Sequence, residues 1–316
     1  MPRALLAVLV LAASLAAQAQ SWPSKPIRLV VPYPPGGSTD VTARTLAERV
    51  SPALGQPLVV ENRAGAGGNI GIEHAAKSDA DGYTVLIAPD FVASAPHVYK
   101  LNYDPMTQLV PVIQLTRQPV VLAVHPSLGV QSVAELVALA KAKPGLAYAT
   151  SGAGSQQHIA AEWFAKLAGI QLTHVPYKGG GQAIADFIGG QVPIASLGST
   201  PVIPHHKSGK VKIIAQTTKS RAPSLPEVPT YEQAGMAGLV IDQWLGVFVP
   251  AGTDAQVVRR LAAEFDKALA EPAVRERLAN AALEAVGGST EDFAQLVRAN
   301  FETYRKLVAD LNIRVN

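Results

Sequence analysis

Short apolar runs alternate with longer segments of helical periodicity along the chain from Ile27 onwards. A strand is expected where four to six apolar residues are bounded by turn-forming residues, and a helix where apolar residues recur every three or four positions. The predicted strands cover residues 27–31, 58–61, 84–88, 120–124, 146–150, 172–175, 194–197 and 211–215, with one more inside 239–250. This alternation predicts an α/β protein, with sheets flanked by helices.

Helical patterns follow most of these strands. Val41, Leu46 and Val50 share one face of a helix predicted over residues 40–54, and a shorter helix is expected at 72–77. Ser132 and Glu135 form a capping box that opens a helix ending near Ala142. From Asp254 to the C-terminus the pattern is helical, with breaks at Pro272 and at residues 287–289.

Two stretches share one local order. "PYPPGGSTD" follows strand 27–31, and "SGAGSQQH" follows strand 146–150; each is a turn of small residues that leads through hydroxyls into a helix. The repetition indicates two α/β lobes with a cleft between them, connected by at least two chain crossings. We assign residues 20–119 and 243–316 to lobe 1 and residues 120–242 to lobe 2. The C-terminal helix could also pack back on lobe 2, and the sequence does not decide this.

The first of these turns is suited to an anion. In open α/β sheets, ligands bind beyond the carboxyl ends of the strands, where helix N-termini present free N–H groups and a positive dipole end. Gly36 and Gly37 let the backbone approach a ligand, and Ser38 and Thr39 supply hydroxyls. A plain helix N-cap would use the same residues, so the turn alone supports both interpretations.

Composition narrows the function classes. The 316 residues contain no cysteine, which excludes disulfides, thiolate metal sites and a cysteine nucleophile. Arg3 and the apolar run "ALLAVLVLAASLA" are typical of a signal peptide, residues 1–19, cleaved near Ala19, so we expect export to the periplasm. Without Arg3, 26 basic side chains face 24 acidic ones, and the basic residues are scattered, so no nucleic-acid partner is expected.

Several residues suggest chemistry without a pattern that supports it. Ser155 and His158 have a spacing that does not by itself orient a base, and their turn lacks the nucleophile-elbow pattern. His205 and His206 are adjacent, so they point apart and are expected at the surface. Trp244 is predicted in the core, with a ligand wall as the alternative, and Lys178 is expected to be solvated. We therefore expect no catalysis, cofactor or metal.

Six ordered blocks together resemble the Bug receptors, the substrate-binding proteins of tripartite tricarboxylate transporters, and the resemblance covers essentially the whole mature chain. The blocks are "WPSKPIRLVVPYPPGGSTDVTARTLAERV", "VVENRAGAGGNIG", "SDADGYTVLIA", "GAGSQQHIAAEWF", "HVPYKGGGQAIADFIGGQVPIA" and "WLGVFVPAGT". The resemblance implies a two-lobed periplasmic binding protein, of Venus-flytrap type, that closes over a small carboxylate. It also implies delivery of this ligand to membrane permease subunits; we expect the receptor to be a monomer.

The resemblance also implies which residues hold the carboxylate. The ligand-binding residues carried over are Tyr33, Gly37, Ser38 and Thr39 in lobe 1 and Ser151, Gly154, Ser155 and His158 in lobe 2, with Ser199 and Thr200 as weaker candidates on the same rim.

Asp90 departs from the family pattern, which has a small or hydroxyl residue after the third strand. If Asp90 or Asp242 faced the cleft, an acid would repel a second carboxylate and suit an amine. Both acids could instead be solvated or cap an amide. A dicarboxylate, an aromatic acid and an amino acid thus all remain candidate ligands. A solute sensor with the same fold, or a periplasmic enzyme acting on a small carboxylate, are the alternative functions.

Overall fold

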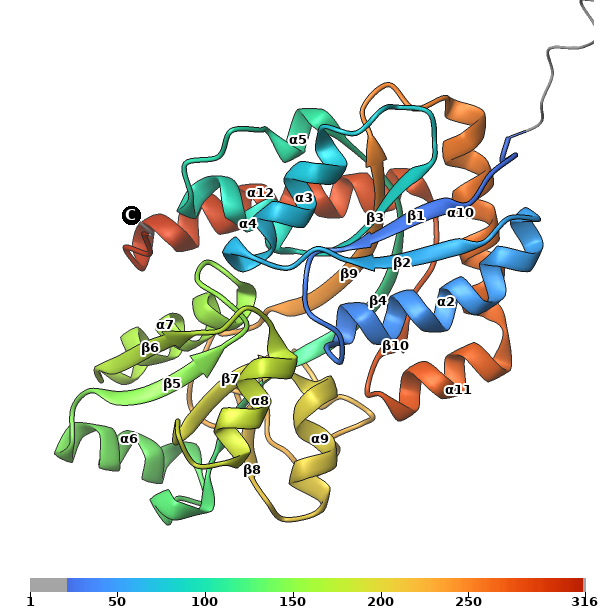
Figure 1. Cartoon of the computed structure of the whole chain (residues 1–316). Coiled ribbons are helices and arrows are strands. Elements are labelled where there is room, and N and C mark those ends of the chain that lie inside the picture. Colours follow the sequence, from blue (N-terminus) through green and yellow to red (C-terminus); the bar gives the residue numbers. More distant parts are fainter. Residues whose placement is uncertain (1–21, 315–316) are drawn as a thin grey trace, which may run out of the picture.

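The computed structural model describes residues 22–314, so the predicted signal peptide lies outside the described residues. Ten strands form a continuous mixed sheet in the order β2-β1-β3-β9-β4-β7-β5-β6, with β8 and β10 also paired to β4 (Figure 1). The strands are β1 (Ile27–Val31), β2 (Leu58–Asn62), β3 (Thr84–Pro89), β4 (Leu109–Val124), β5 (Leu146–Thr150), β6 (Leu172–Pro176), β7 (Ile194–Gly198), β8 (Lys212–Gln216), β9 (Asp242–Pro250) and β10 (Glu284–Ala285).

Strand β4 connects the two halves of the sheet. It pairs antiparallel with β9 as far as Pro119 and Asp242, and from Val120 onwards it pairs with β7 and β8 instead. The sequence predicted only residues 120–124 of this strand, and that prediction was too short. Polar residues and Pro111 interrupt the apolar run before Val120, and two register irregularities fall in the same part. We propose this change of partner as the division between the lobes, at the boundaries expected from the sequence.

The predicted helices are present, and four others were missed. The helices are α2 (Ser38–Leu54), α3 (Asn69–Ala76), α4 (Phe91–Val98), α5 (Pro105–Gln108), α6 (Val133–Ala142), α7 (Gln156–Ala168), α8 (Gly180–Ile188), α9 (Ser199–Lys207), α10 (Ala255–Ala270), α11 (Pro272–Asn280) and α12 (Thr290–Asp310); Ala66–Gly68 and Pro126–Leu128 are short 3₁₀ helices. Helices α4, α5, α8 and α9 escaped prediction. Pro96 and Pro204 interrupt α4 and α9, glycines begin α8, and α5 is a single turn of four residues.

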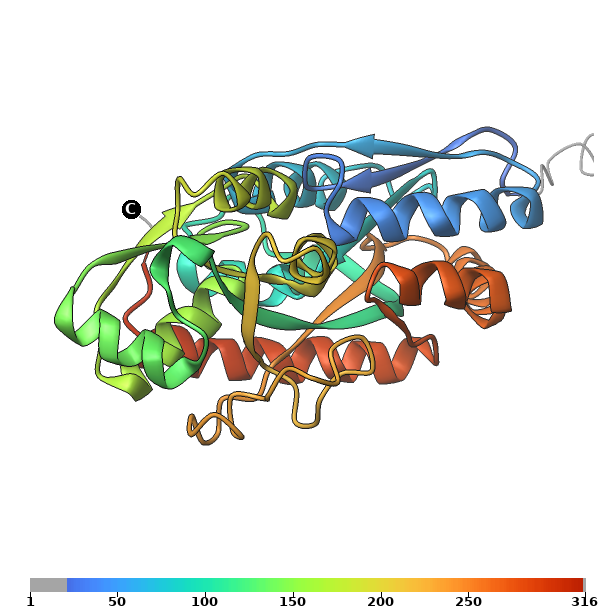
Figure 2. The ribbon, with the colours of Figure 1, turned by 90° about the horizontal axis from the view of Figure 1, so that it is seen from below.

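Each half of the sheet has its own hydrophobic core, and α12 connects them. Lobe 1 packs α2 and α10 against β1, β3 and β9, whereas lobe 2 packs α6 and α7 on one face of its sheet and α8 and α9 on the other. Figure 2 shows α12, in red, running along the side of both halves. Its Tyr304 and Val308 pack with Ile159 of α7, and Lys166 of α7 donates to the Asp310 carbonyl. The C-terminal helix thus contacts lobe 2 as well as lobe 1.

Candidate functional site

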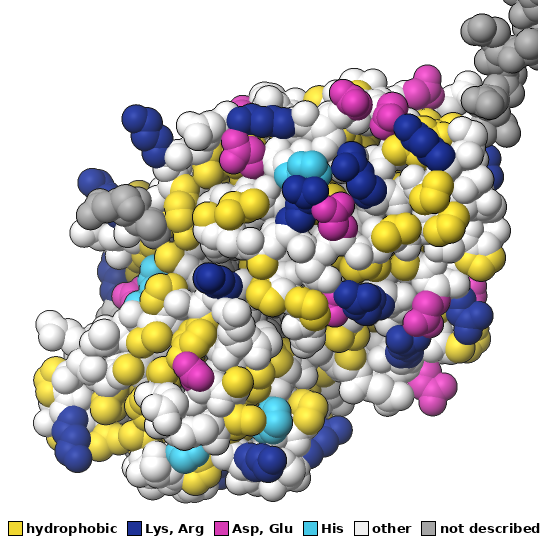
Figure 3. Space-filling view, viewed as in Figure 1, with side chains coloured by type: hydrophobic (Ala, Val, Ile, Leu, Met, Phe, Trp, Pro, Cys, Tyr) yellow, Lys and Arg dark blue, Asp and Glu magenta, His cyan; other side chains and the backbone are white. Residues whose placement is uncertain are grey.

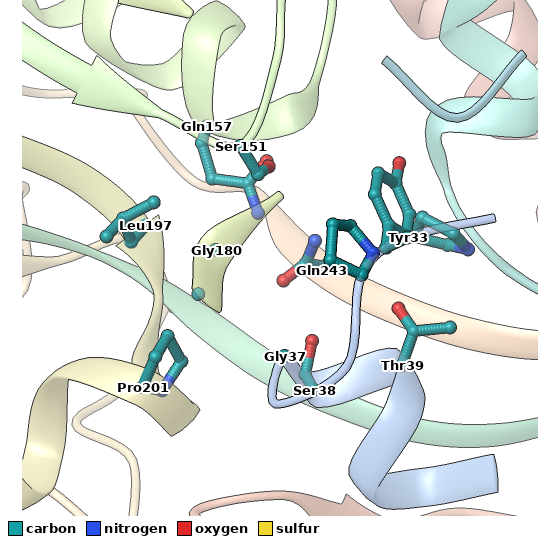
Figure 4. A pocket seen from close by; sticks show the side chains of 13 residues that line it. Tyr33, Gly37, Ser38, Thr39, Ser151, Gln157, Gly180, Leu197, Pro201 and Gln243 are labelled. Carbon is teal, nitrogen blue, oxygen red and sulfur yellow. The ribbon is translucent and has the colours of Figure 1, made fainter. Parts of the chain in front are cut away.

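A pocket lies between the two lobes, where the carboxyl ends of β1, β3, β5 and β7 meet. It has about 440 Å³ of unfilled space, part of which is open solvent. The lining residues come from both lobes (Figure 4) and none of them is charged: Tyr33, Pro34, Gly37, Ser38, Thr39, Pro89, Ser151, Gln157, Gly180, Leu197, Gly198, Pro201 and Gln243. A ligand held here meets amides, hydroxyls and apolar surface.

The first turn presents its polar groups to this pocket. Helix α2 begins after Gly37, and no side chain caps its free N–H groups. The hydroxyls of Ser38 and Thr39 do not serve as the cap, so the plain N-cap interpretation of these residues was wrong. Figure 4 shows both residues at the start of α2, beside the pocket. The helix start therefore combines unpaired backbone donors, a positive dipole end and two hydroxyls.

A charged network behind the turn fixes its shape. Asp40 accepts hydrogen bonds from the Gly36 N–H (3.1 Å), Asn62 Nδ2 (3.0 Å) and Arg44, and Asn62 also donates to the Tyr33 carbonyl (2.9 Å). Burial alone would raise the pKa of Asp40, but the hydrogen bonds from Arg44, Asn62 and Gly36 lower it below its ordinary value. Asp40 therefore stays ionised, and Arg44 compensates its charge at 3.0 Å. The sequence had placed Asp40 in the helix without this role.

The second turn uses its polar groups internally. Ser155 caps α7 by accepting from the His158 N–H (3.3 Å) and donates to the Gly152 carbonyl (2.7 Å). His158 Nδ1 accepts from the Gly154 N–H (3.0 Å), and its ring stacks on His174 with centroids 3.8 Å apart. Burial, with the nearby His174, lowers the pKa of His158 to about 3. His158 is thus a neutral, buried acceptor.

Two further helix starts open towards the pocket from lobe 2. Helix α8 follows Gly179 and α9 follows Gly198, and neither glycine can cap its helix with a side chain. In α9, Gln118 Oε1 already accepts from the Thr200 N–H (3.1 Å). A Cβ at Gly179 would lie 3.0 Å from Pro34 Cδ of lobe 1, so glycine allows the α8 start to approach the first turn closely. Three helices with glycine N-caps, α2, α8 and α9, therefore begin around one uncharged pocket.

The structure brings five of the predicted ligand residues together in the lining, namely Tyr33, Gly37, Ser38, Thr39 and Ser151. The others lie behind it. Gly154 and Ser155 shape the second turn. The Gly154 carbonyl accepts a hydrogen bond from the Ser94 hydroxyl of lobe 1 (2.8 Å). Thr200 donates its N–H (3.1 Å) and hydroxyl (2.9 Å) to Gln118, and the Ser199 hydroxyl donates to the same amide oxygen (3.2 Å). Direct ligand contacts by any of these residues stay predictions.

Asp90 is outside the lining. Its side chain is 1% exposed, and Oδ2 accepts a hydrogen bond from the Tyr304 hydroxyl of α12 (2.7 Å). Burial raises the pKa of Asp90 to about 7. Asp90 is neither solvated nor a side-chain cap of α4, and Asp242, half-buried, is likewise absent from the lining.

Sequence reasoning missed the two glutamines of the pocket. Gln157 stands inside "SGAGSQQH", where attention went to the serine and histidine, and Gln243 precedes Trp244 in the returning strand. Gln157 Oε1 accepts from the Ser151 hydroxyl (2.9 Å), and Gln243 Oε1 accepts from Gln118 Nε2 (2.7 Å). Trp244 itself is 2% exposed and packs edge-on against Phe293, which confirms the predicted core position.

Comparison with known proteins identifies the family. Residues 42–313 match the family described as "Tripartite tricarboxylate transporter family receptor". The chain belongs to this family. Among curated relatives of this receptor chain is the protein BugT of Bordetella pertussis, 39% identical over 285 residues, which cover 87% of this chain and 86% of BugT. The Bug resemblance read from the sequence is thereby confirmed.

Solved structures similar to this receptor family member share the two-lobed fold. An R. palustris protein with adipate has a TM-score of 0.90 and 34% identity, covering 93% of this chain and all of the other. MatC from Rhodopseudomonas palustris with bound malate has a TM-score of 0.87 and 29% identity, covering 91% of this chain and all of MatC. The periplasmic binding protein BugD has a TM-score of 0.88 and 30% identity, covering 93% of this chain and all of BugD. The predicted fold class is confirmed.

Residues 22–314 contain neither a metal-binding cluster nor a helix that could span a membrane. Within them, no group of three or more His, Cys, Asp or Glu side chains is arranged to hold a metal ion. None of the described helices combines the length and apolar character that crossing a membrane requires. On the face shown in Figure 3, basic and acidic side chains are interspersed.

Proposed function

We propose that this family member is an exported periplasmic receptor that captures a small carboxylate and delivers it to the permease subunits of a tripartite tricarboxylate-type transporter. The observation that carries the proposal is the pocket itself. Three helices with glycine N-caps begin around a lining that contains no charged side chain.

The physical chemistry of this arrangement favours an anion. The first N–H groups of a helix have no partner within the helix, and the dipole adds about half a positive charge at that end. A carboxylate accepts several such hydrogen bonds at once, and bonds to a charged acceptor are stronger than neutral ones. Because the site uses fixed dipoles instead of a cation, the bound ligand does not have to break a strong ion pair to leave.

The relatives support the ligand class. Adipate and malate, which accompany the proteins in two of the similar structures, are both dicarboxylates. The lobes of this chain also contact each other directly across the cleft, through the Tyr99 hydroxyl and the Ala153 carbonyl (2.9 Å), as a closed receptor would. We expect the exported protein to act as a monomer, with its signal peptide removed near Ala19.

Native mass spectrometry of protein purified from the periplasm without refolding tests this proposal. We expect a mass increment of one small molecule that, once released, is identified as a carboxylic acid and is recovered chemically unchanged after incubation with the protein. Release of a phosphorylated, cationic or uncharged compound, or conversion of the acid to a product, would contradict it. Co-purification with a membrane permease distinguishes transport from sensing.

A further inference from the structure

A pair of glutamines joins the two strands that cross between the lobes. Gln118 of β4 and Gln243 of β9 are register partners, 3% and 6% exposed. The Oε1 atom of Gln118 accepts from the Thr200 N–H, the Thr200 hydroxyl and the Ser199 hydroxyl. Because a backbone N–H can only donate, the accepting atom has to be the oxygen, and this fixes which way the Gln118 amide is turned.

The orientation of Gln118 in turn fixes Gln243. Gln118 Nε2 donates to Gln243 at 2.7 Å, so the atom facing it has to be Oε1 and the Gln243 NH₂ group points away. This NH₂ has no acceptor among residues 22–314. Figure 4 shows the Gln243 nitrogen turned towards the space between Gln243 and Gln157. Gln243 therefore presents a hydrogen-bond donor to the pocket.

Gly198 packs directly against the pair. Gly198, at the end of β7, covers both amides: a Cβ there would lie 2.6 Å from Gln118 Nε2 and 2.6 Å from Gln243 Oε1. Any larger residue would displace one of the amides.

The lining of the pocket contains no acidic partner for an ammonium group. No Asp or Glu is among the lining residues. Asp90, next to the lining residue Pro89, accepts a hydrogen bond from Tyr304. Asp242 precedes Gln243 in β9, and consecutive side chains of a strand point to opposite faces of the sheet. An ammonium bound beside Gln243 would face another donor, and a buried donor without an acceptor is unfavourable. A carboxylate, keto or hydroxyl oxygen at that place would accept the Gln243 hydrogen bond.

We propose that Gln118 is a positioning residue for ligand selection: it holds Gln243 as a donor, so that the receptor selects acids whose second polar group is an acceptor over the corresponding amino acids. This inference rests on the proposed carboxylate-binding function and names the ligand class within it. Gln243 is the residue that makes the contact, and Gln118 acts only through it.

Calorimetric titration with matched acid pairs tests the proposal. The probes are malate and aspartate, 2-oxoglutarate and glutamate, and adipate and 2-aminoadipate, added to refolded, ligand-free protein. We expect at least one acceptor acid to bind at least about tenfold more tightly than its amino counterpart. If none of the six compounds nor any other small carboxylate binds, the proposed function fails. If amino acids bind as tightly as their counterparts or more tightly, only the selectivity inference fails.

Two variants test whether Gln118 and Gln243 cause this selectivity. Gln243→Glu keeps an acceptor for Gln118 but places a carboxylate oxygen where the NH₂ was, so the preference should reverse in favour of the amino acid. Gln118→Met removes the constraint on the Gln243 amide, which can then turn its oxygen to the pocket; the selectivity ratio should fall about tenfold. Gln216→Met, at another buried amide of lobe 2 that donates to the Leu225 and Val228 carbonyls, is the matched control and should leave the ratio unchanged.

The ratio of the affinities for an acid and its amino counterpart shows whether Gln118 positions Gln243 or only stabilises the fold. If Gln118→Met weakens both members of a pair equally, Gln118 only stabilises the fold and the proposal is wrong. If Gln118→Met does not fold, Gln243→Glu decides alone, because its hydrogen bond from Gln118 is retained. An unchanged preference in Gln243→Glu would overturn the proposal.

Discussion

The two turns that look alike in sequence use their polar groups in opposite ways. In the turn before α2, Gly37 leaves the helix start uncapped, and the Ser38 and Thr39 hydroxyls lie at the pocket. In the turn before α7, Ser155 caps the helix and His158 accepts from the Gly154 N–H. A serine one position earlier or later thus decides whether the helix start is capped or left open at the pocket. The comparison predicts separable effects on affinity and stability.

The largest effect is expected from a negative charge at the first turn. Ser38→Asp places a carboxylate at the first residue of α2, where it favours the helix but competes with an anionic ligand. Because like charges brought together in a binding site cost several kcal/mol, affinity for the bound acid should fall by about 100-fold or more. Ser132→Asp, which changes the N-cap of α6 on the far side of lobe 2, is the matched control. Titration calorimetry should find that the affinity of Ser132→Asp for the bound acid equals that of the unsubstituted protein.

Acidification should affect the second turn through stability. Burial lowers the pKa of His174 to about 4, and that of His158 to about 3, so both rings are neutral in the folded protein. Unfolded histidines titrate near pH 6.5. Between about pH 6.5 and 4 the unfolded chain therefore binds protons that the folded chain excludes, and the free energy of unfolding should fall as the pH falls. The slope is at most about 1.4 kcal/mol per pH unit for each histidine.

Urea unfolding at pH 7 and pH 5 measures this slope. Asp90 acts in the opposite direction, because burial raises its pKa to about 7 and the folded protein then binds a proton that the unfolded chain releases. The comparison is therefore made in an Asp90→Asn background, with and without His158→Gln and His174→Gln. The free energy of unfolding should depend less on pH in the variant that also carries His158→Gln and His174→Gln. Equal slopes would mean that the two rings are not buried as neutral groups.

Removing a single hydroxyl at the first turn should weaken binding and spare the fold. Ser38→Ala deletes a potential hydrogen bond to a charged ligand, worth about 1.5 kcal/mol or somewhat more, so the dissociation constant should rise roughly tenfold. The free energy of unfolding should change by less than about 0.5 kcal/mol, since Ser38 caps nothing. A loss of stability without a loss of affinity would place Ser38 with the structural residues.

The smallest effect, and the mirror of the previous one, is expected at the second turn. Ser155→Ala removes the cap of α7 and should lower the free energy of unfolding by about 1 kcal/mol. Its affinity for the ligand should change by less than about threefold. An affinity loss as large as that of Ser38→Ala would show that the two turns are equivalent after all.

The sequence predicted what depends on local pattern. Strands such as Ile27–Val31 and Leu146–Thr150 are short, mainly apolar runs. The Ser132 cap of α6 is present as expected, although Glu135 accepts from the Gln131 N–H and not from the Ser132 N–H of a full capping box. The first half of β4 was missed because its polar and proline residues are accommodated only by pairing with β9. Such elements can be predicted because the residues that determine them lie within one strand or one helix start.

The site was harder to predict, since it depends on contacts between distant residues. Gln118 and Gln243 are 125 positions apart, and neither belongs to a recognisable motif. Ser199 and Thr200 were expected at the ligand, but their donors are directed to Gln118 behind the pocket. Asp90 follows a strand that leads to the pocket, yet Tyr304 of the last helix binds it from behind. A local sequence pattern does not show whether the hydrogen-bond partner of a residue is the ligand or a distant residue of the chain.

The most direct test of the account compares small carboxylates with their amides. Refolded, ligand-free protein is titrated calorimetrically with a panel of mono-, di- and tricarboxylic acids, each beside the amide of the same shape. If uncapped helix starts hold an anion, at least one acid should bind with one-to-one stoichiometry, and its amide should bind about 100-fold more weakly. Equal affinity for acid and amide, or no binding by any acid of the panel, would contradict the account.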